Sequence, residues 1–491
     1  MDSGTEVEGG LICPQGDLKK SLIGKATAIL AWVACSTALH AASLADFGYR
    51  NRTINGRLPI GGRPLLVIMA CFDPQGPSSC FANFEHQWPF YHDLVFNFAR
   101  SPVNMNAYFL ENSNGRFWWT GVDTELGAGA GLTRVWINSA GCLECPGVTN
   151  VGYYSNIVRQ AMQNVRFADY DANRNGVVTQ DEMAIAIINS DFKAGGTRDA
   201  GYVPGPEAAF HGQVSNLGYY VTFDTWCHEL SHSLRTLDLY GTNCSSYGVT
   251  LLSCSGLDVN DRSWHLDPWH KMQFGWSEPR IRSLTAGGVE SISAAQLMDP
   301  AAPIILNDHG RGTSEFFMLE YRTPTSPNGP GYDANVASDA ITTNGLAIWH
   351  IKQDGSHNPV FAGGNPVVWT DGSPNLLHGG SGLWGSDVTT PELRYLDGTS
   401  SRTRIRVLPF SAGGAEVRVE WLYPGETWVD FSYVGVERGS FAQPFNTLVE
   451  GVFYGSHGGT IRVKAGSRPE TLSVSKRLVI QSFNGPVTIG R

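Results

Sequence analysis

The sequence predicts an α/β domain followed by an all-β region, because the pattern of apolar residues changes along the chain. Near the start, residues 64–70 form an unbroken apolar run, which is typical of a buried strand. Apolar residues with helical spacing follow at 89–100 and 156–165. From about residue 281, short alternating runs separated by Gly, Pro, Asn and Ser take over. With 491 residues, the chain is too long for a single core, so several domains are expected.

Further segments complete each region. In the α/β part, the apolar run 183–188 predicts another buried strand and 222–234 predicts a helix. Asp224, near the start of that helix, either caps its N-terminus or favours its dipole. The alternating runs of the all-β part, which together predict a β-sandwich, lie at 316–321, 345–351, 404–408 and 415–422.

A third pattern begins after Pro424 and Gly425. The stretches 439–448 and 458–466, followed by short apolar runs near residues 479 and 488, resemble the opening coil of a right-handed parallel β-helix. Such coils bury their faces only by stacking, and about three of them are needed. This piece is therefore expected either to belong to a truncated solenoid or to cap the β domain.

Composition and charge exclude two classes of protein. Hydrophobic residues make up 42% of the chain and charged residues 16%, and this balance excludes a long disordered chain. The net charge is -10 and the sequence has no dense run of Lys or Arg, which excludes nucleic acid as an expected partner.

The N-terminus has the features of an export signal. A stretch with three lysines at 19–25 precedes an apolar run at 26–38, and Ser43-Leu44-Ala45 has the small-x-small form that a signal peptidase accepts. A membrane anchor is the alternative, but the apolar run is short for a span. We therefore expect a signal peptide, a secreted protein and no stable membrane insertion after signal removal.

Cysteine usage agrees with an oxidising compartment. Of nine cysteines, two fall in the expected signal, and the proximity of the others suggests three local disulfides. The pairs would be Cys71–Cys80, Cys142–Cys145 and Cys244–Cys254. Cys227 is then left over and is expected to be a small buried core residue. The C-x-x-C at 142–145 has no second pair, so a zinc knuckle is not expected.

The clearest chemical motif is an HExxH sequence, His228-Glu229-Leu230-Ser231-His232, within the expected helix. Positions i and i+4 share one face of a helix, so both imidazoles can reach one metal ion. Histidine suits zinc, and two helical ligands leave room for a third protein ligand and a water. Glu229 lies beside the first ligand, where it can take a proton from the water that the metal activates.

A third zinc ligand is expected after a bend that follows His232. In zincins with such a bend, this ligand comes at the spacing of Asp238. A surface or helix-capping carboxylate is the alternative role for Asp238. The bend normally needs glycine because its backbone is left-handed, and here the residue is Arg235, which costs about 1–2 kcal/mol in that conformation. A looser bend, or a third ligand from elsewhere, is the other interpretation.

With this motif, several segments resemble the immune inhibitor A family of secreted metallopeptidases. The family pattern HExxHxxGxPDxY matches 228–240 without the glycine and proline, and the methionine turn matches 250–253 with Leu252 in place of methionine. The other matching segments are Pro268 to Trp276, Phe317-Met318-Leu319-Glu320, Gly331-Tyr332-Asp333 and Gly345-Leu346-Ala347-Ile348-Trp349-His350. The resemblance covers about residues 60–355 and implies a zincin, metzincin-like catalytic domain.

A calcium loop is expected at 171–182. The calcium-loop template is matched by Asp171, Asn173 and Asn175 at positions 1, 3 and 5, Gly176 at 6, the carbonyl of Val177 at 7, Thr179 at 9 and Glu182 at 12. The alternative is a surface turn rich in Asn and Gly. The resembled family also has such a loop before its zinc helix, which implies that calcium makes the catalytic domain rigid.

Together these observations predict a signal peptide at 1–45, a zincin-like catalytic domain at 46–280, a β-sandwich at 281–424 and a β-helix-like segment at 425–491. The expected function is that of a zinc endopeptidase that cleaves proteins or peptides, with Zn2+ and Ca2+ as cofactors. Tyr240 and His265 are the candidates for a hydrogen-bond donor to the transition state. One alternative is a weakly active or inactive surface protein on a peptidase scaffold, motivated by Arg235 and Leu252. The other is a carbohydrate-binding exoprotein.

Overall fold

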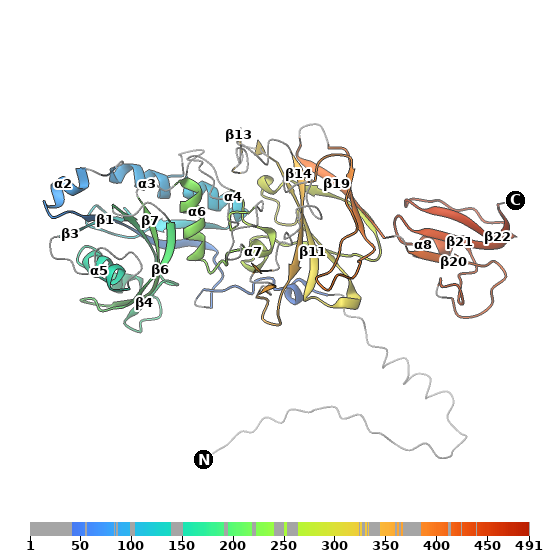
Figure 1. Cartoon of the computed structure of the whole chain (residues 1–491), viewed down its shortest axis with the longest axis horizontal. Helices are drawn as coiled ribbons and strands as arrows, with labels where there is room; N and C mark the ends of the chain where they lie inside the picture. The colour runs from blue at the N-terminus through green and yellow to red at the C-terminus, as the bar shows by residue number, and fades with distance from the viewer. Residues whose placement is uncertain are drawn as a thin grey trace, which may run out of the picture. The chain divides into compact units, whose positions relative to one another are not determined.

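The computed structural model describes residues 42–491 except for 55, 83, 85–86, 99–103, 139–150, 191–194, 219–221, 240–249, 253–263, 324, 327–328, 331, 333–343, 359–360, 363–364, 367–383, 411–413, 424, 438 and 491. Residues Ser43–Arg491 form one compact unit. This unit is mixed α/β, with several sheets and few helices (Figure 1).

The first part of the unit is built around a seven-stranded sheet. The strand order is β2-β1-β5-β7-β4, and β3 also pairs with β1 and β6 with β7. All pairs are parallel except β6, which is antiparallel to β7. The strands are β1 (Gly61–Phe72), β2 (Phe117–Gly121), β3 (Leu132–Ile137), β4 (Val177–Thr179), β5 (Ala184–Asn189), β6 (Gly195–Val203) and β7 (Ala209–Gly218).

Both faces of the central strands are buried. Successive residues of a strand point to opposite faces, so Leu66 and Ile68 pack in one core while Leu65 and Val67 are buried on the other side. Figure 1 shows α5 on one side of the sheet and α2, α3 and α4 on the other. The helices of this part are η1 (Leu44–Phe47), α2 (Pro77–Ala82), α3 (Trp88–Phe96), α4 (Met105–Asn112), α5 (Val151–Ala161) and η2 (Phe167–Tyr170). The two predicted buried strands, at 64–70 and 183–188, are confirmed as β1 and β5.

Two more helices follow the sheet. Helix α6 (Phe223–His232) begins after Thr222, whose hydroxyl accepts a hydrogen bond from the N–H of Thr225. Asp224 therefore does not cap the helix; it lies in the first turn, where a negative charge favours the dipole. The short helix α7 (Pro268–Gln273) has Asp267 as its N-cap.

Two four-stranded sheets follow, and they share one core. Their strand orders are β14-β11-β10-β8 and β17-β18-β19-β9. Leu319 and Ile348 from the first sheet and Ile405 and Val419 from the second are fully buried in this core, as the β-sandwich prediction requires. The elements are β8 (Arg280–Ser283), β9 (Gly288–Ser293), η3 (Ala295–Leu297), β10 (Ile304–Asn307), η4 (His309–Arg311), β11 (Glu315–Arg322), β14 (Gly345–Lys352), β17 (Val388–Thr389), β18 (Arg404–Val407) and β19 (Glu416–Leu422), with two small hairpins, β12 (Thr325–Ser326) with β13 (Gly329–Pro330) and β15 (Phe361–Ala362) with β16 (Asn365–Pro366).

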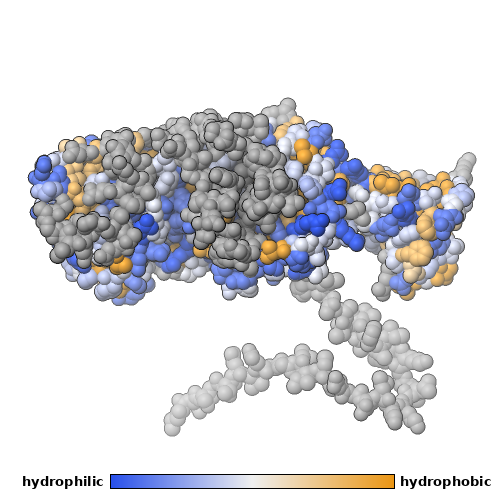
Figure 2. All heavy atoms as spheres, viewed as in Figure 1, coloured by the Kyte–Doolittle hydropathy of each residue, from blue (hydrophilic) through white to orange (hydrophobic). Residues whose placement is uncertain are grey.

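The last part is a three-stranded sheet, β20 (Glu426–Val429), β21 (Thr460–Arg468) and β22 (Val479–Ile489), with helix α8 (Leu448–Tyr454). All its pairs are parallel, which is the pairing that the predicted β-helix-like piece requires. Its core is small, and six buried hydrophobic residues form it among those that the structure describes. Figure 2 shows apolar surface on this part, where exposed side chains include Val434, Phe453 and Val479.

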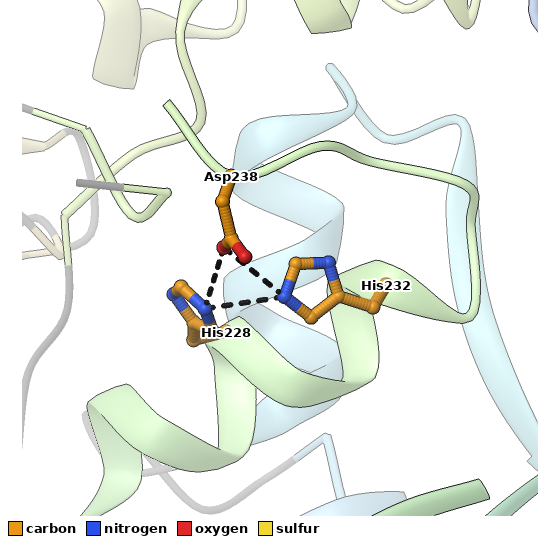
Figure 3. A group of neighbouring side chains, drawn as sticks. All are labelled: His228, His232 and Asp238. Carbon is orange, nitrogen blue, oxygen red and sulfur yellow. Dashed lines mark hydrogen bonds and ion pairs between the residues drawn. The ribbon is translucent and has the colours of Figure 1, made fainter. Parts of the chain in front are cut away.

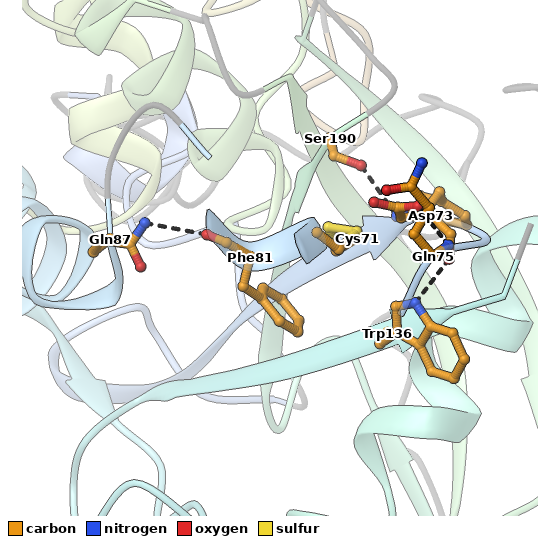
Figure 4. Close-up of a disulfide and its surroundings, with 9 residues drawn as sticks. Cys71, Asp73, Gln75, Phe81, Gln87, Trp136 and Ser190 are labelled. Atoms are coloured by element: carbon orange, nitrogen blue, oxygen red, sulfur yellow. Dashed lines mark hydrogen bonds between the residues drawn. A yellow bond between two sulfur atoms is a disulfide. The ribbon is translucent and has the colours of Figure 1, made fainter. Parts of the chain in front are cut away.

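One of the predicted disulfides falls among the described residues. Cys71 at the end of β1 is bonded to Cys80 in α2, with Cα atoms 5.9 Å apart (Figure 4). Beside this bond, the indole N–H of Trp136 donates to the carbonyl of Asp73 at 2.9 Å. Cys227 is buried, as predicted, with its sulfur 3.8 Å from that of Met105.

Other predictions lie outside the described residues. They are the export signal up to residue 41 and the pairs Cys142–Cys145 and Cys244–Cys254. In the part of the chain that the structure describes, no helix combines the length and apolar character needed to span a membrane.

Candidate metal centre

Helix α6 carries the two histidines of the HExxH motif on one face. The helix contacts β6 and β7, and the hydroxyl of Ser215 on β7 donates to the backbone carbonyl of Glu229 at 2.8 Å. The side chains of Trp226 and Leu230, both on this helix, are buried. This packing fixes the orientation of the helix, and therefore also the direction of the face that carries His228 and His232.

The chain turns back immediately after this helix. The N–H of Arg235 bonds to the carbonyl of His232, and Arg235 itself has φ 65°, in the left-handed region. The bend that the resemblance implies therefore forms with arginine in place of glycine. Four residues after Arg235, the N–H of Leu239 donates to the carbonyl of Leu252, which holds the returning chain against the stretch 250–252.

The bend brings Asp238 to the two histidines (Figure 3). The Nε2 atoms of His228 and His232 lie 3.2 Å apart, and Oδ1 of Asp238 lies 3.2 Å from the first and 3.3 Å from the second. Their ligand atoms all lie within 4.8 Å of one another. Among the described residues, these three form the only group of His, Cys, Asp and Glu side chains close enough to share a metal ion.

Backbone carbonyls orient both imidazoles. The Nδ1–H of His228 donates to the carbonyl of Leu251 at 2.8 Å, and Nδ1 of His232 lies 3.3 Å from the carbonyl of Thr236. With Nδ1 protonated, Nε2 of each neutral ring presents a lone pair to the other ring and to Asp238. Three electron-pair donors facing one another repel, and a proton or a metal cation between them removes that repulsion.

The charges of the site shift two pKa values in opposite directions. Although burial disfavours its charged form, the hydrogen bond to Asp238 and the nearby carboxylates raise the pKa of His228 to about 9. Burial alone would raise the pKa of Asp238, but its hydrogen bonds to His228 and His232 hold that pKa well below its usual range. The cluster therefore attracts positive charge strongly.

Glu229 lies beside this cluster, in contact with the edge strand β6. Its Oε2 accepts a hydrogen bond from the hydroxyl of Thr197 at 3.3 Å. A Cβ at Gly195 would clash first with Cγ2 of Thr225, and it would also lie 3.1 Å from both Cγ and Oε1 of Glu229. Glycine therefore leaves the space that this carboxylate occupies.

One structural partner of the site was not predicted. The Nε2 of His270 accepts a hydrogen bond from the N–H of Leu237 at 3.3 Å, and its Nδ1–H donates to Asp267 at 2.7 Å. All atoms of the His270 and Asp267 side chains are buried. Leu237 directly precedes Asp238, so this pair holds the bend near its end. The sequence shows only an Asp-x-x-His pattern here, and so short a pattern does not indicate that the pair holds the bend before Asp238.

His265 has no access to a substrate. Its side chain is fully buried, with Nε2 2.6 Å from Glu111 and Nδ1 3.1 Å from the ammonium of Lys271. It is therefore a structural residue and not a transition-state donor. The other candidate, Tyr240, lies outside the described residues.

The predicted calcium loop 171–182 forms a tight turn closed on itself. Asp171 accepts hydrogen bonds from the N–H groups of Asn175 and Gly176, and Glu182 accepts from those of Asn173 and Thr179. The loop thus brings position 12 back to positions 3 and 9. In detail, Oδ1 of Asn173 accepts from the N–H of Asn175, Oδ1 of Asn175 from the N–H of Val177, and Gly176 has φ 81°. Val177 to Thr179 form β4, which pairs with β7 and connects the loop to the central sheet.

Comparisons with known proteins add no assignment. The sequence matches no model of a protein family, and it matches no curated protein.

Proposed function

We propose that this protein is a zinc-dependent endopeptidase. The observation that carries the proposal is the convergence of His228 Nε2, His232 Nε2 and the Asp238 carboxylate, with Glu229 next to the first of them. This combination of nitrogen and oxygen donors is that of catalytic zinc sites, which use three protein ligands and leave one position open.

The chemistry of the donors supports zinc. Both rings direct Nε2 to the centre while Nδ1 faces a backbone carbonyl, an arrangement that fixes the tautomer and makes the ligand more basic. About 39% of the Asp238 side chain is exposed and 14% of each histidine, so solvent and substrate have a route to the site from the Asp238 side.

The mechanism assigns the proton transfers to Glu229. A zinc ion in this centre supplies a Lewis acid, which lowers the pKa of a water and polarises a peptide carbonyl. The Glu229 carboxylate takes the proton from the attacking water and delivers it to the leaving amine. The contact with Thr197 holds one oxygen of this carboxylate in place and leaves the other for the proton.

We also infer that the loop 171–182 binds calcium in a structural role. Its five side chains at positions 1, 3, 5, 9 and 12 supply oxygen ligands, and hard cations such as calcium prefer oxygen. Its strand β4 pairs with β7, the strand that precedes α6, so an ordered loop supports the base of the zinc helix.

The test of the endopeptidase proposal is Glu229→Gln in the full chain, with casein cleavage and bound zinc measured on the same samples. We expect one zinc per chain in both proteins and a loss of about 100-fold or more in turnover in the variant, as for removal of a general base. Glu426→Gln, at a half-exposed glutamate of the last sheet, is the matched control. Undiminished cleavage by Glu229→Gln would exclude the mechanism. Tightly bound zinc without any cleavage by the wild type would favour the alternative of a binding protein on a peptidase scaffold.

A further inference from the structure

Arg235 stands where the bend after the HExxH helix normally has glycine, and the structure shows what its side chain does there. The guanidinium donates two parallel hydrogen bonds to Asp181, from Nε to Oδ1 at 3.0 Å and from Nη2 to Oδ2 at 2.8 Å. Bidentate pairs of this kind fix geometry as well as charge. The Arg235 side chain is 48% exposed but the Asp181 side chain only 13%, so the fixed partner is the aspartate.

Asp181 belongs to a rigid part of the molecule. It is position 11 of the loop 171–182, between two anchored neighbours. The Gln180 side chain accepts from the N–H of Gln213 on β7 at 2.6 Å, and the Gln180 carbonyl accepts from Arg63 on β1 at 3.0 Å. Glu182 accepts two hydrogen bonds from Thr179. Asp181 therefore presents its carboxylate from a position set by the central sheet.

The backbone of Arg235 determines where Asp238 lies. Its φ of 65° is unfavourable for a residue with a Cβ, so the local preference of the chain is for another conformation. Asp238 follows three residues later, and its Oδ1 atom lies 3.2–3.3 Å from both histidines. A change of φ at residue 235 moves this carboxylate away from them.

We propose that Arg235 is a positioning residue of the metal centre: its ion pair with Asp181 holds the left-handed bend that places Asp238 opposite His228 and His232. The inference rests on the proposed zinc site and assigns a role to a residue that departs from the glycine pattern. In this chain, a long-range ion pair replaces the backbone freedom of glycine. If this is so, a glycine at position 235 removes the need for the ion pair with Asp181.

The test compares zinc affinities in the full chain, measured by competition with a chromophoric chelator. Arg235→Ala and Asp181→Asn are each expected to weaken zinc binding about tenfold, the lower end of the effect of residues that orient metal ligands. Arg235→Gly is expected to bind zinc within about threefold of the wild type, because glycine adopts a positive φ without cost. Adding Asp181→Asn to Arg235→Gly is expected to leave the zinc affinity of the Arg235→Gly variant unchanged.

Arg311→Ala, which removes an Arg–Asp pair with Asp397 in the β domain, is the matched control and is expected to bind zinc as the wild type does. Melting curves of the zinc-free proteins show that each variant is folded, and the nearly isosteric Asp181→Asn carries the test where Arg235→Ala is unstable. The inference is overturned if Asp181→Asn has the same effect in both backgrounds, or if Arg235→Ala binds zinc as the wild type does. A wild type that binds no zinc overturns the proposed function itself, and the inference with it.

Discussion

The imidazole of His270 lies between Asp267 and the backbone N–H of Leu237, so a buried pair from α7 holds the residue that precedes Asp238. Burial keeps the pKa of His270 below its usual value, although Asp267 opposes this, and the ring is therefore neutral at pH 7. A neutral ring with Nδ1–H directed at Asp267 must accept at Nε2, which is the role that the N–H of Leu237 requires.

The first prediction concerns this tautomer. In Asp267→Asn, the side-chain oxygen can still accept from the N–H of His270, but the amide group then faces Nδ1. We expect the proton to move to Nε2, where it opposes the N–H of Leu237. Zinc affinity should fall about tenfold, and the free energy of unfolding should fall by about 1–3 kcal/mol.

Nitrogen-15 NMR of the histidine rings reports the tautomer, and chelator competition reports the zinc affinity. Asp308→Asn is the control, because Asp308 also accepts a capping N–H, that of Gly310, far along the chain in the β domain. An unchanged tautomer of His270 together with an unchanged zinc affinity would show that the pair does not act on the bend.

The second prediction concerns pH and zinc. Because the pKa of His228 is raised to about 9 in the metal-free protein, zinc that binds at the proposed site must displace a proton at neutral pH. Apparent zinc affinity should therefore rise about tenfold per pH unit between pH 7 and 9 and then level off. The measurement is a competition titration at constant ionic strength, corrected for protonation of the chelator. A pH-independent affinity over this range would contradict the raised pKa.

The third prediction concerns the stability of the metal-free protein. The folded pKa of His228 lies above its ordinary value of 6.5, so its contribution to stability is complete below pH 6.5 and is lost as pH rises through 9. The contribution is on the order of 3 kcal/mol. Urea unfolding of metal-free protein between pH 6 and 9.5 should show this loss. The variant His228→Asn should lose much less stability over the same range.

Local patterns predicted much of the fold. The strands β1, β5, β11, β14, β18 and β19 lie where apolar or alternating runs predicted them, because their residues are buried on at least one face. The helix predicted at 156–165 is observed as α5, Val151–Ala161, so its boundaries were wrong by about one turn. Element ends depend on capping and on contacts with neighbours, which periodicity does not contain.

The candidate site was predictable in part. HExxH spacing places His228 and His232 on one helical face, and the spacing of Asp238 is a second local signal. The ion pair between Arg235 and Asp181 joins residues 54 positions apart, and the hydrogen bond between Leu237 and His270 joins residues 33 positions apart. Such partners are fixed by tertiary packing, so no local pattern indicates them.

The fourth prediction concerns the calcium loop. Calcium should raise the melting temperature of the wild type, and at 100 times the dissociation constant the gain is about 2.7 kcal/mol. Glu182→Gln should lose most of this gain, because Glu182 occupies position 12, which in the calcium-loop template binds the ion through both oxygens. Glu207→Gln, at an exposed glutamate paired with Arg166, should keep it. Equal stabilisation of both variants would show that calcium acts elsewhere.

The last prediction concerns a buried charge network that joins α7 to the first sheet of the β domain. Lys271 on α7 pairs with Glu320 on β11 at 3.2 Å, and Glu320 also accepts from Arg322 at 2.8 Å. All three side chains are at least 95% buried. They fasten α7, which carries His270, to the first sheet of the β domain.

Removing one charge from such a network leaves the others buried without it, and this costs about 3–5 kcal/mol. Glu320→Gln should therefore lower the free energy of unfolding by about that amount, measured by urea denaturation of the full chain. Glu278→Gln, at a half-exposed glutamate paired with Arg116, should change it by less than about 1 kcal/mol. Similar losses in the two variants would mean that burial of the Lys271–Glu320–Arg322 group does not set its contribution to stability.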